Sequence, residues 1–211
     1  YEMHAPMPML PLRLFAMRNF SVTNIETFAV YGALSGWGVF TTLFLLEFAH
    51  YSPLRAGVAT VPVTIVMFVL SPRIGRLSMR YGPHLFMAVG PALAGISLVA
   101  FARLPVKLDY WVDFLPPLLG FSVGLSLTVA PLTTTVLSDA GPSDAGIASG
   151  VNNAVARVAG LIAVAVLGIA AAGGGDHLTV HGFHQSMLVV SALLVAGGAI
   201  GALGIRNPKA A

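Results

Sequence analysis

The chain contains 211 residues, of which 56% are hydrophobic and only 9% carry a charge, and its mean hydropathy is +0.85. Soluble globular domains carry about 25% charged residues, so this composition excludes an ordinary soluble protein and favours one embedded in a lipid bilayer. The formal net charge is +3, but the basic residues are scattered through short loops, which argues against nucleic-acid binding. The absence of cysteine excludes thiol catalysis, disulfides and thiolate metal sites.

The chain opens with a proline-rich segment. Its first twelve residues, YEMHAPMPMLPL, contain three prolines, so we predict an interfacial linker over residues 1–18 and no cleavable signal peptide. The chain starts at Tyr1, without an initiator methionine. We therefore expect a fragment that begins between two helices of a longer protein.

Six apolar runs follow the linker, each close to or above the roughly 17–25 residues that span a bilayer. The sequence therefore predicts an all-α membrane protein, with six transmembrane helices over residues 19–205 and a cytoplasmic tail over residues 206–211. The predicted helices cover residues 19–48, 54–77, 85–103, 111–137, 147–172 and 183–205.

The charges between these helices predict the orientation of the unit. Six crossings place both ends on one side, so the loops form two alternating sets, and one set holds seven basic residues against three in the other. Because basic loops stay in the cytoplasm, we predict a multi-pass cell-membrane protein whose richer set is cytoplasmic. The richer set comprises Arg13, Arg18, Arg73, Arg76, Arg80, Arg206 and Lys209, and the poorer set comprises Arg55, Arg103 and Lys107.

A short basic stretch, GRLSMRYGPH, lies between the second and third predicted helices. It resembles the cytoplasmic loop motif of the major facilitator superfamily, G-x-L-x-D-R-x-G-R/K-R/K, but lacks the aspartate and the last two basic residues of that motif. The matching positions are Gly75, Leu77, Arg80 and Gly82, and the departures are Met79, Pro83 and His84.

Three longer segments extend this resemblance over most of the chain. They are RNFSVTNIETFAVYGAL, YSPLRAGVATVPVTIVMFVLSPRIG and VAPLTTTVLSDAGPSDAGIASGVNNAVARVAGLIAVAVLG. In this order they are similar to the C-terminal half of the fourteen-helix drug:proton antiporters of the superfamily. The resemblance implies one half of a major facilitator fold, whose partners would be a missing N-terminal half of the same polypeptide, the lipid bilayer and a small amphipathic substrate.

The function that the resemblance implies is proton-coupled efflux of drugs or other amphipathic compounds by alternating access. Such transport uses the proton gradient and needs no cofactor, and we expect neither a catalytic residue nor a metal site. Two alternatives stay open: a non-transporting membrane scaffold or an inert truncated fragment. An intramembrane enzyme is less favoured, because such an enzyme needs a nucleophile and base, or a metal cluster, that meet in space.

The basic stretch is also a candidate gating loop. Gly75 and Gly82 permit tight turns and close helix approach, and Arg80 can hold an acidic partner or helix carbonyl groups at the membrane edge. These contacts would stabilise one conformation of the transporter, although Met79 removes the acid of the motif. The alternative is that these arginines only determine topology.

Glu26 is the candidate for the proton-coupling residue. It lies eight residues after Arg18, or about 12 Å along a helix, which places it within the depth of the hydrocarbon. Ionisable groups at this depth are costly and often functional, and desolvation favours the neutral acid. Glu26 would then gain and release a proton as a cavity opens and closes. Alternatively, it lies shallowly at the interface, or pairs with Asn24 or a neighbouring helix.

Arg157 is the second charge inside a predicted helix, with Asn153 four residues earlier on the same face. Together with Asn24, these residues are candidates for the lining of a substrate cavity. Arg157 would tune an acid or hold an anionic group, or it would instead form a fixed structural ion pair. The first, fourth and fifth helices hold most of the polar residues, and the resemblance implies that the third and sixth helices face lipid.

Three histidines near the outer side have the spacing H-x3-H-x2-H. They are His177, His181 and His184. Imidazoles at such spacing can bind zinc on a helix, but this run follows three glycines, so we expect no metal here.

Overall fold

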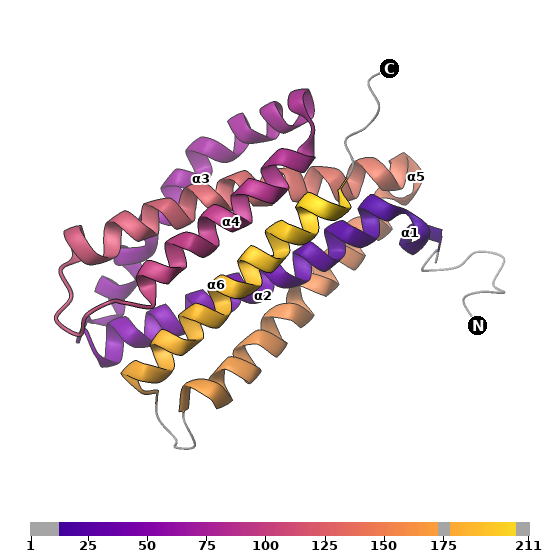
Figure 1. The fold of residues 1–211 in the computed structure, drawn as a ribbon. Helices are drawn as coiled ribbons and strands as arrows, with labels where there is room; N and C mark the ends of the chain where they lie inside the picture. The colour runs from indigo at the N-terminus through magenta and orange to yellow at the C-terminus, as the bar shows by residue number, and fades with distance from the viewer. Residues whose placement is uncertain (1–12, 173–177, 206–211) are drawn as a thin grey trace.

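The structure is a computed structural model that describes residues 13–172 and 178–205, and Figure 1 shows them as a bundle of long helices. Six segments of these residues are long and apolar enough to cross a membrane, which confirms the predicted number. The elements are α1 (Arg13–Ala16), α2 (Arg18–Glu47), α3 (Pro53–Tyr81), α4 (Pro83–Phe101), the π-helical η1 (Tyr110–Phe114), α5 (Leu115–Ala172) and α6 (Val180–Gly204).

Helix α5 supplies two of the six spans, because its backbone breaks at Gly141, where φ is 73° and ψ is 170°. We call the residues before Gly141 the first arm of α5 and those after it the second arm. The two spans are Tyr110–Leu137 and Asp144–Ile169. The second arm returns towards the end from which the first began (Figure 1), so the two arms are separate membrane crossings.

The turn predicted from GRLSMRYGPH is much shorter than expected. Helix α3 continues to Tyr81, four residues past the predicted end at position 77, and α4 begins at Pro83. Only Gly82 lies between them, with φ at 88° and ψ at 151°, a region that essentially only glycine occupies and that costs other residues about 1–3 kcal/mol. Gly75 is therefore inside a helix and makes no turn. Pro83 is the first residue of α4, a position that proline suits because no helical N–H bond is needed there.

The predicted tail and most of the predicted linker lie outside the described residues. Residues 1–12 and 206–211 are not described, whereas residues 13–16 form the single turn α1 and Arg18 already belongs to α2. The guanidinium of Arg13 forms an ion pair of 2.6 Å with Asp144, at the start of the second arm of α5.

The start of α2 and the end of α6 lie at the same end of the bundle. The Arg18 guanidinium donates to the carbonyl oxygens of Gly204 at 2.8 Å and Leu203 at 3.0 Å. His84, at the start of α4, lies 2.8 Å from the carbonyl oxygen of Ala202. The charge count predicts that this end is cytoplasmic. The contacts give hydrogen-bond partners to carbonyl groups that have no intrahelical partner at the end of α6.

Aromatic residues fill the core on the opposite half of the bundle. The Trp37 ring of α2 lies 4.5 Å from the Phe121 ring and 6.2 Å from the Phe101 ring, between ring centroids. Phe44 of α2 stacks on Phe183 of α6 at 4.3 Å. These contacts place α2 at the centre, with α4, α5 and α6 around it.

Two helices are far more exposed than the others. Only 11% of the apolar window of α3 and 17% of that of the second arm of α5 are buried, against 39% or more in the other four spans. These two helices therefore present most of their surface to lipid or to further protein. The implied lipid contact of α4 and α6 stays a prediction.

Candidate functional site

A groove of about 750 Å³ lies between α2 and the second arm of α5, and we call it the α2–α5 groove. Two of the predicted cavity residues, Asn153 and Arg157, line it. The remaining lining consists of Tyr31, Ser35, Ala156, Gly160, Leu161, Val164 and Ala165. The groove is thus largely apolar, with a few polar groups and one guanidinium, which is the usual composition of a site for small organic molecules.

Arg157 is exposed towards this groove. Among the side chains that the structure describes, the ion pair found is the one between Arg13 and Asp144, and Arg157 has no acidic partner there. A guanidinium within a membrane span is costly unless water or a counter-charge meets it. The fixed ion pair considered from the sequence is therefore not formed within the described residues.

Asn153 lies one turn before Arg157 on the same wall. Its amide donates to the carbonyl oxygen of Ser149 at 3.0 Å, and the residue itself is exposed. Asn153 thus adds hydrogen-bonding capacity to the wall that carries the Arg157 charge.

Asn24 lies beneath the groove and not in it. Its side chain is 7% exposed, and its amide donates to the carbonyl oxygen of Phe20 at 2.8 Å. The Asn152 amide of α5 donates to the Asn24 side-chain oxygen at 3.3 Å and to the Thr27 hydroxyl at 2.7 Å. These bonds join α2 to the second arm of α5, so Asn24 positions the groove.

The polar residues of α2 that meet the second arm form one stripe. The stripe begins at Asn24 and continues three, seven and eleven residues later, at Thr27, Tyr31 and Ser35. A helix turns by about 100° per residue, so these four positions fall within roughly 80° of one another around the helix axis. Tyr31 and Ser35 were not predicted as groove residues, although this spacing in the sequence identifies them.

Glu26 lies about 145° from the centre of that stripe by the same count, on the opposite face of α2. It is fully buried against α6. A Cβ atom built on Gly201 would stand 2.8 Å from the Glu26 Oε2 atom, and one built on Gly197 would stand 3.9 Å from its Cγ atom. The carboxyl group therefore lies between α2 and α6, away from the α2–α5 groove.

Neither carboxyl oxygen of Glu26 has a hydrogen-bond partner among the described residues. The hydroxyl of Thr23, one turn earlier, also has no hydrogen-bond partner there. The pairing with Asn24 that the sequence allowed is not formed there. Burial without a partner is tolerated far better by a neutral carboxylic acid than by a carboxylate. The environment of Glu26 in this conformation therefore suits the protonated form.

The predicted gating residues are spread along the end of α3. Gly75 is helical, and a Cβ built there would meet only the Ala130 Cβ at an ordinary 3.9 Å. Arg80 is exposed, and its guanidinium carbon lies 5.4 Å from the centre of the Tyr81 ring. Gly82 alone forms the turn to α4.

The histidine array lies only partly within the described residues. No group of three metal-ligating side chains is found there, and His177 lies outside them. The His184 Nε2 atom lies 3.0 Å from the carbonyl oxygen of Leu104, so this ring joins α6 to the loop after α4.

Comparison with known proteins connects this architecture to transporters. The model of a family described as the Major Facilitator Superfamily matches residues 5–164. The cephamycin export protein of Amycolatopsis lactamdurans is 30% identical to the chain over 77% of this chain and 34% of that protein. The methylenomycin A resistance protein of Streptomyces coelicolor is 26% identical, over 90% of this chain and 40% of the relative.

A third relative, the tetracenomycin C resistance and export protein of Streptomyces glaucescens, is 28% identical over 80% of this chain and 31% of its own length. The chain thus spans between 31% and 40% of the length of these three relatives.

Proposed function

Because this chain belongs to the Major Facilitator Superfamily, we propose that it forms the C-terminal half of a proton-coupled exporter of drugs or other amphipathic compounds. The family and the six apolar spans make it a multi-pass protein of the cell membrane. In the proposed exporter, this six-helix unit rocks against an N-terminal half of the same polypeptide, with the substrate held between them. The export and resistance proteins named above support this class of substrate.

The observation that carries the proposal is the wall formed by Asn153 and Arg157 in the α2–α5 groove. A charged group at the depth of a membrane span marks a substrate or ion pathway by default. The apolar residues around it would bind the hydrophobic part of an amphipathic compound, and Asn153 would orient its polar part. Arg157 would bind an anionic group of the substrate or an acidic side chain of the other half.

Proton coupling is assigned to Glu26 because it is buried and has no hydrogen-bond partner among the described residues. The neutral acid suits the conformation described here, and release of the proton requires water to reach the space between α2 and α6. The energy source would then be the proton gradient, without a cofactor.

The cytoplasmic gate is assigned to the end of α3 and the turn after it, with Gly82 as the hinge and Arg80 as its charged contact. Gly75 would act earlier in α3, where it faces Ala130 of the first arm of α5. The gate would work by changing the angle between α3 and α4.

Resistance in cells tests the substrate groove. The protein, in the longest form that its gene encodes, is expressed in a host that lacks its own drug exporters. We expect growth in the presence of at least one of cephamycin, methylenomycin A, tetracenomycin C and ethidium, because the groove suits amphipathic compounds. Arg157→Gln should abolish this resistance. Arg103→Gln, which removes the same charge from the loop after α4, should retain it. Equal resistance in both variants would contradict the groove, and failure of the parent protein with all four would contradict export of this class.

Proton release tests Glu26. In proteoliposomes, we expect the substrate identified above to drive proton movement through the parent protein and not through Glu26→Gln, which keeps the shape of the side chain but cannot ionise. Glu47→Gln is the matched control, because Glu47 is the exposed last residue of the same helix. Unchanged coupling in Glu26→Gln would remove Glu26 from the mechanism.

A further inference from the structure

Helix α6 lies between α2 and α4 (Figure 1), and both neighbours contact its last carbonyl groups. The His84 Nε2 atom, at the start of α4, lies 2.8 Å from the carbonyl oxygen of Ala202. The Arg18 guanidinium of α2 donates to the carbonyl oxygens of Leu203 and Gly204. These contacts hold the three helices together at the end that the charge count predicts to be cytoplasmic.

The Glu26 carboxyl group lies between the same three helices, one turn further into the membrane. A Cβ built on Gly201 would stand 2.8 Å from the Glu26 Oε2 atom and 2.7 Å from the Met87 carbonyl oxygen of α4, so these two oxygens are at most 5.5 Å apart. His84 precedes Met87 by three residues, or about 4.5 Å along α4 towards the cytoplasmic end. We call the region that contains Glu26, His84, Met87 and Gly201 the α2–α4–α6 seam.

The cytoplasmic part of this seam is largely apolar in the conformation described here. Met87, Leu132 and Ile205 form a buried cluster at its edge. Thr23 adds a polar group, because it lies three residues before Glu26 on α2 and is fully buried. Its hydroxyl has no hydrogen-bond partner among the described residues, and buried polar groups of this kind usually bind water. A water molecule that enters here would therefore find partners in Thr23 and Glu26.

Histidine is the residue type whose side chain gains and loses a proton near neutral pH, and His84 is the histidine at this end among the described residues. Helix α2 contributes Arg18 and Glu26 to the seam, and the described end of α6 has no titratable side chain. At the start of the second arm of α5, the Asp144 carboxylate pairs with Arg13. Arginine does not release its proton in proteins, so His84 is the group that can exchange a proton with Glu26.

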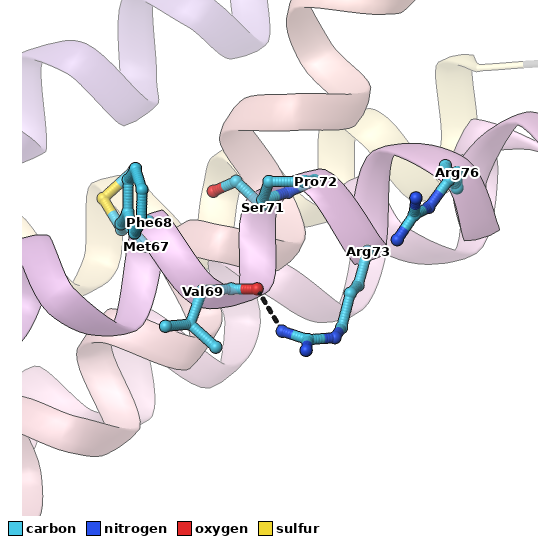
Figure 2. A pocket seen from close by; sticks show the side chains of 7 residues that line it. All are labelled: Met67, Phe68, Val69, Ser71, Pro72, Arg73 and Arg76. Carbon is cyan, nitrogen blue, oxygen red and sulfur yellow. Dashed lines mark hydrogen bonds between the residues drawn. The ribbon is translucent and has the colours of Figure 1, made fainter.

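The basic end of α3 adds no charge to the seam. Helix α3 packs mainly against α5, and its arginines bond to their own helix or are exposed. Figure 2 shows the Arg73 guanidinium directed to the Val69 carbonyl oxygen, which accepts its hydrogen bond at 2.6 Å, and Arg76 further along α3. Arg76, Arg80 and Tyr81 are exposed.

We propose that His84 carries the coupled proton between Glu26 and the cytoplasm, an inference that rests on the proton coupling proposed for Glu26. A carbonyl oxygen only accepts hydrogen bonds, so the His84 Nε2 atom bears a hydrogen towards Ala202, and Nδ1 is the atom that gains and loses a proton. In release, the Glu26 O–H bond breaks as its proton passes to a water molecule beside Thr23, and that water gives a proton to Nδ1. The imidazolium then gives a proton to cytoplasmic water, which leaves a carboxylate at Glu26 and a neutral imidazole at His84.

A relay through a side chain suits this end of the protein better than an open water channel. The bonds from Arg18 to the last carbonyl groups of α6 close the seam towards the cytoplasm, and a continuous column of water would have to break them. A relay through His84 needs water only between the imidazole and Glu26.

The rate of proton exchange at Glu26 tests the relay without transport. The protein, in the longest form that its gene encodes, is reconstituted in vesicles with its predicted cytoplasmic side outward. The outside pH is stepped, and the infrared carbonyl band of the neutral Glu26 carboxyl group is followed with time; its absence in Glu26→Gln assigns the band. We expect His84→Gln to slow the exchange about 100-fold, the effect of removing a positioned proton-transfer group. The glutamine amide can still donate to the Ala202 carbonyl oxygen.

Two failures of this experiment have different meanings. A parent protein without a band that Glu26→Gln removes would contradict proton coupling by Glu26, and the relay with it. A parental exchange rate in His84→Gln would overturn the relay alone.

Added imidazole separates a relay from a structural role of His84. Free imidazole can carry the proton where the side chain is missing, so it should restore most of the lost rate in His84→Gln and leave the parent rate unchanged. His84→Arg keeps a donor and adds a fixed charge, and it should be as slow as His84→Gln because a guanidinium does not release its proton. Slow variants that imidazole does not restore would overturn the relay and leave His84 as a structural partner of α6.

Thr23→Val tests the path with a variant that should fold at least as well as the parent, because it removes a buried hydroxyl that has no partner among the described residues. We expect the exchange rate to fall about fivefold, the factor that one hydrogen bond contributes. Thr41→Val is the matched control, since the Thr41 hydroxyl is also buried without a described partner, nearer the other end of α2. Equal exchange rates in the two variants would overturn the path beside Thr23.

Discussion

Alanine substitutions at Gly201 and Gly198 can distinguish an effect on stability from an effect on proton coupling. An added Cβ at Gly201 would stand 2.8 Å from the Glu26 Oε2 atom and 2.7 Å from the Met87 carbonyl oxygen. An added Cβ at Gly198, one turn earlier on α6, would stand 2.8 Å from the carbonyl oxygen of Ala88, and its three nearest neighbours all belong to α4. Both substitutions therefore crowd the backbone of α4, and only Gly201→Ala also crowds the carboxyl group.

The expected magnitude follows from these distances. Ordinary contacts start near 3.4 Å, so each new methyl group is about 0.6 Å too close to a carbonyl oxygen of α4, which can yield only if α4 moves. Overpacking of this kind costs about 1–3 kcal/mol, and replacement of a helical glycine by alanine returns up to about 1 kcal/mol. We expect Gly201→Ala and Gly198→Ala to destabilise the protein similarly, by about 1–2 kcal/mol.

The two variants should differ in transport. The Glu26 side chain has rotatable bonds, so at Gly201→Ala its carboxyl group moves away from α6 while the α4 backbone shifts only slightly. We expect the number of protons released per substrate in proteoliposomes to fall in Gly201→Ala and to stay at the parent value in Gly198→Ala. Intrinsic tryptophan fluorescence during thermal unfolding measures the shared loss of stability, because Trp37 is buried in the core. If both variants lose coupling to the same extent, packing of α6 controls coupling and the position of the Glu26 carboxyl does not.

Three further predictions concern stability and use the same unfolding assay. Gly124→Ala should destabilise by about 1–3 kcal/mol, because its Cβ would lie 2.5 Å from the backbone nitrogen of an α4 residue, whereas Gly146→Ala meets nothing within 4 Å and should be neutral or stabilising. Gly82→Ala should cost about 1–3 kcal/mol because its φ of 88° and ψ of 151° lie in a region that essentially only glycine occupies, and equal tolerance of Gly82→Ala and the helical control Gly75→Ala would contradict the one-residue turn. Asn152→Ala removes two hydrogen bonds to α2 and should cost about 0.6–2 kcal/mol; a neutral result would mean that water replaces the amide fully.

The number and type of the helices could be predicted from the apolar runs in the sequence, because an uninterrupted run of this length forms a helix when it crosses a bilayer. The length of the turns could not. GRLSMRYGPH contains arginines and a proline that are typical of loops, yet the helix persists to Tyr81 because only Gly82 adopts a positive φ. Which glycine of such a stretch takes that conformation depends on how α3 and α4 pack, and this information is not local.

The candidate site residues could also be predicted from the sequence, but their neighbours in the fold could not. The types and depths of Glu26, Asn153 and Arg157 single them out in the sequence, since charged and amide groups are rare in membrane spans. The helical period also separates Glu26 from the stripe that contains Asn24 and Tyr31. It does not reveal which neighbouring helix each face meets, and the contact of Glu26 with α6 depends on the small side chains at that point of α6.

The positions of these groups limit how a proton and a substrate can be coupled. Glu26 and the α2–α5 groove lie on opposite faces of α2, and a helix with its side chains is about 10–12 Å wide. A direct contact between the Glu26 carboxyl and a compound in the groove is therefore excluded in this conformation. If Glu26 carries the coupled proton, its ionisation must act by changing how α2 packs against α6. Arg18 ties the start of α2 to the last carbonyl groups of α6, so the two helices would pivot about that end, and the wall of the groove would move with α2.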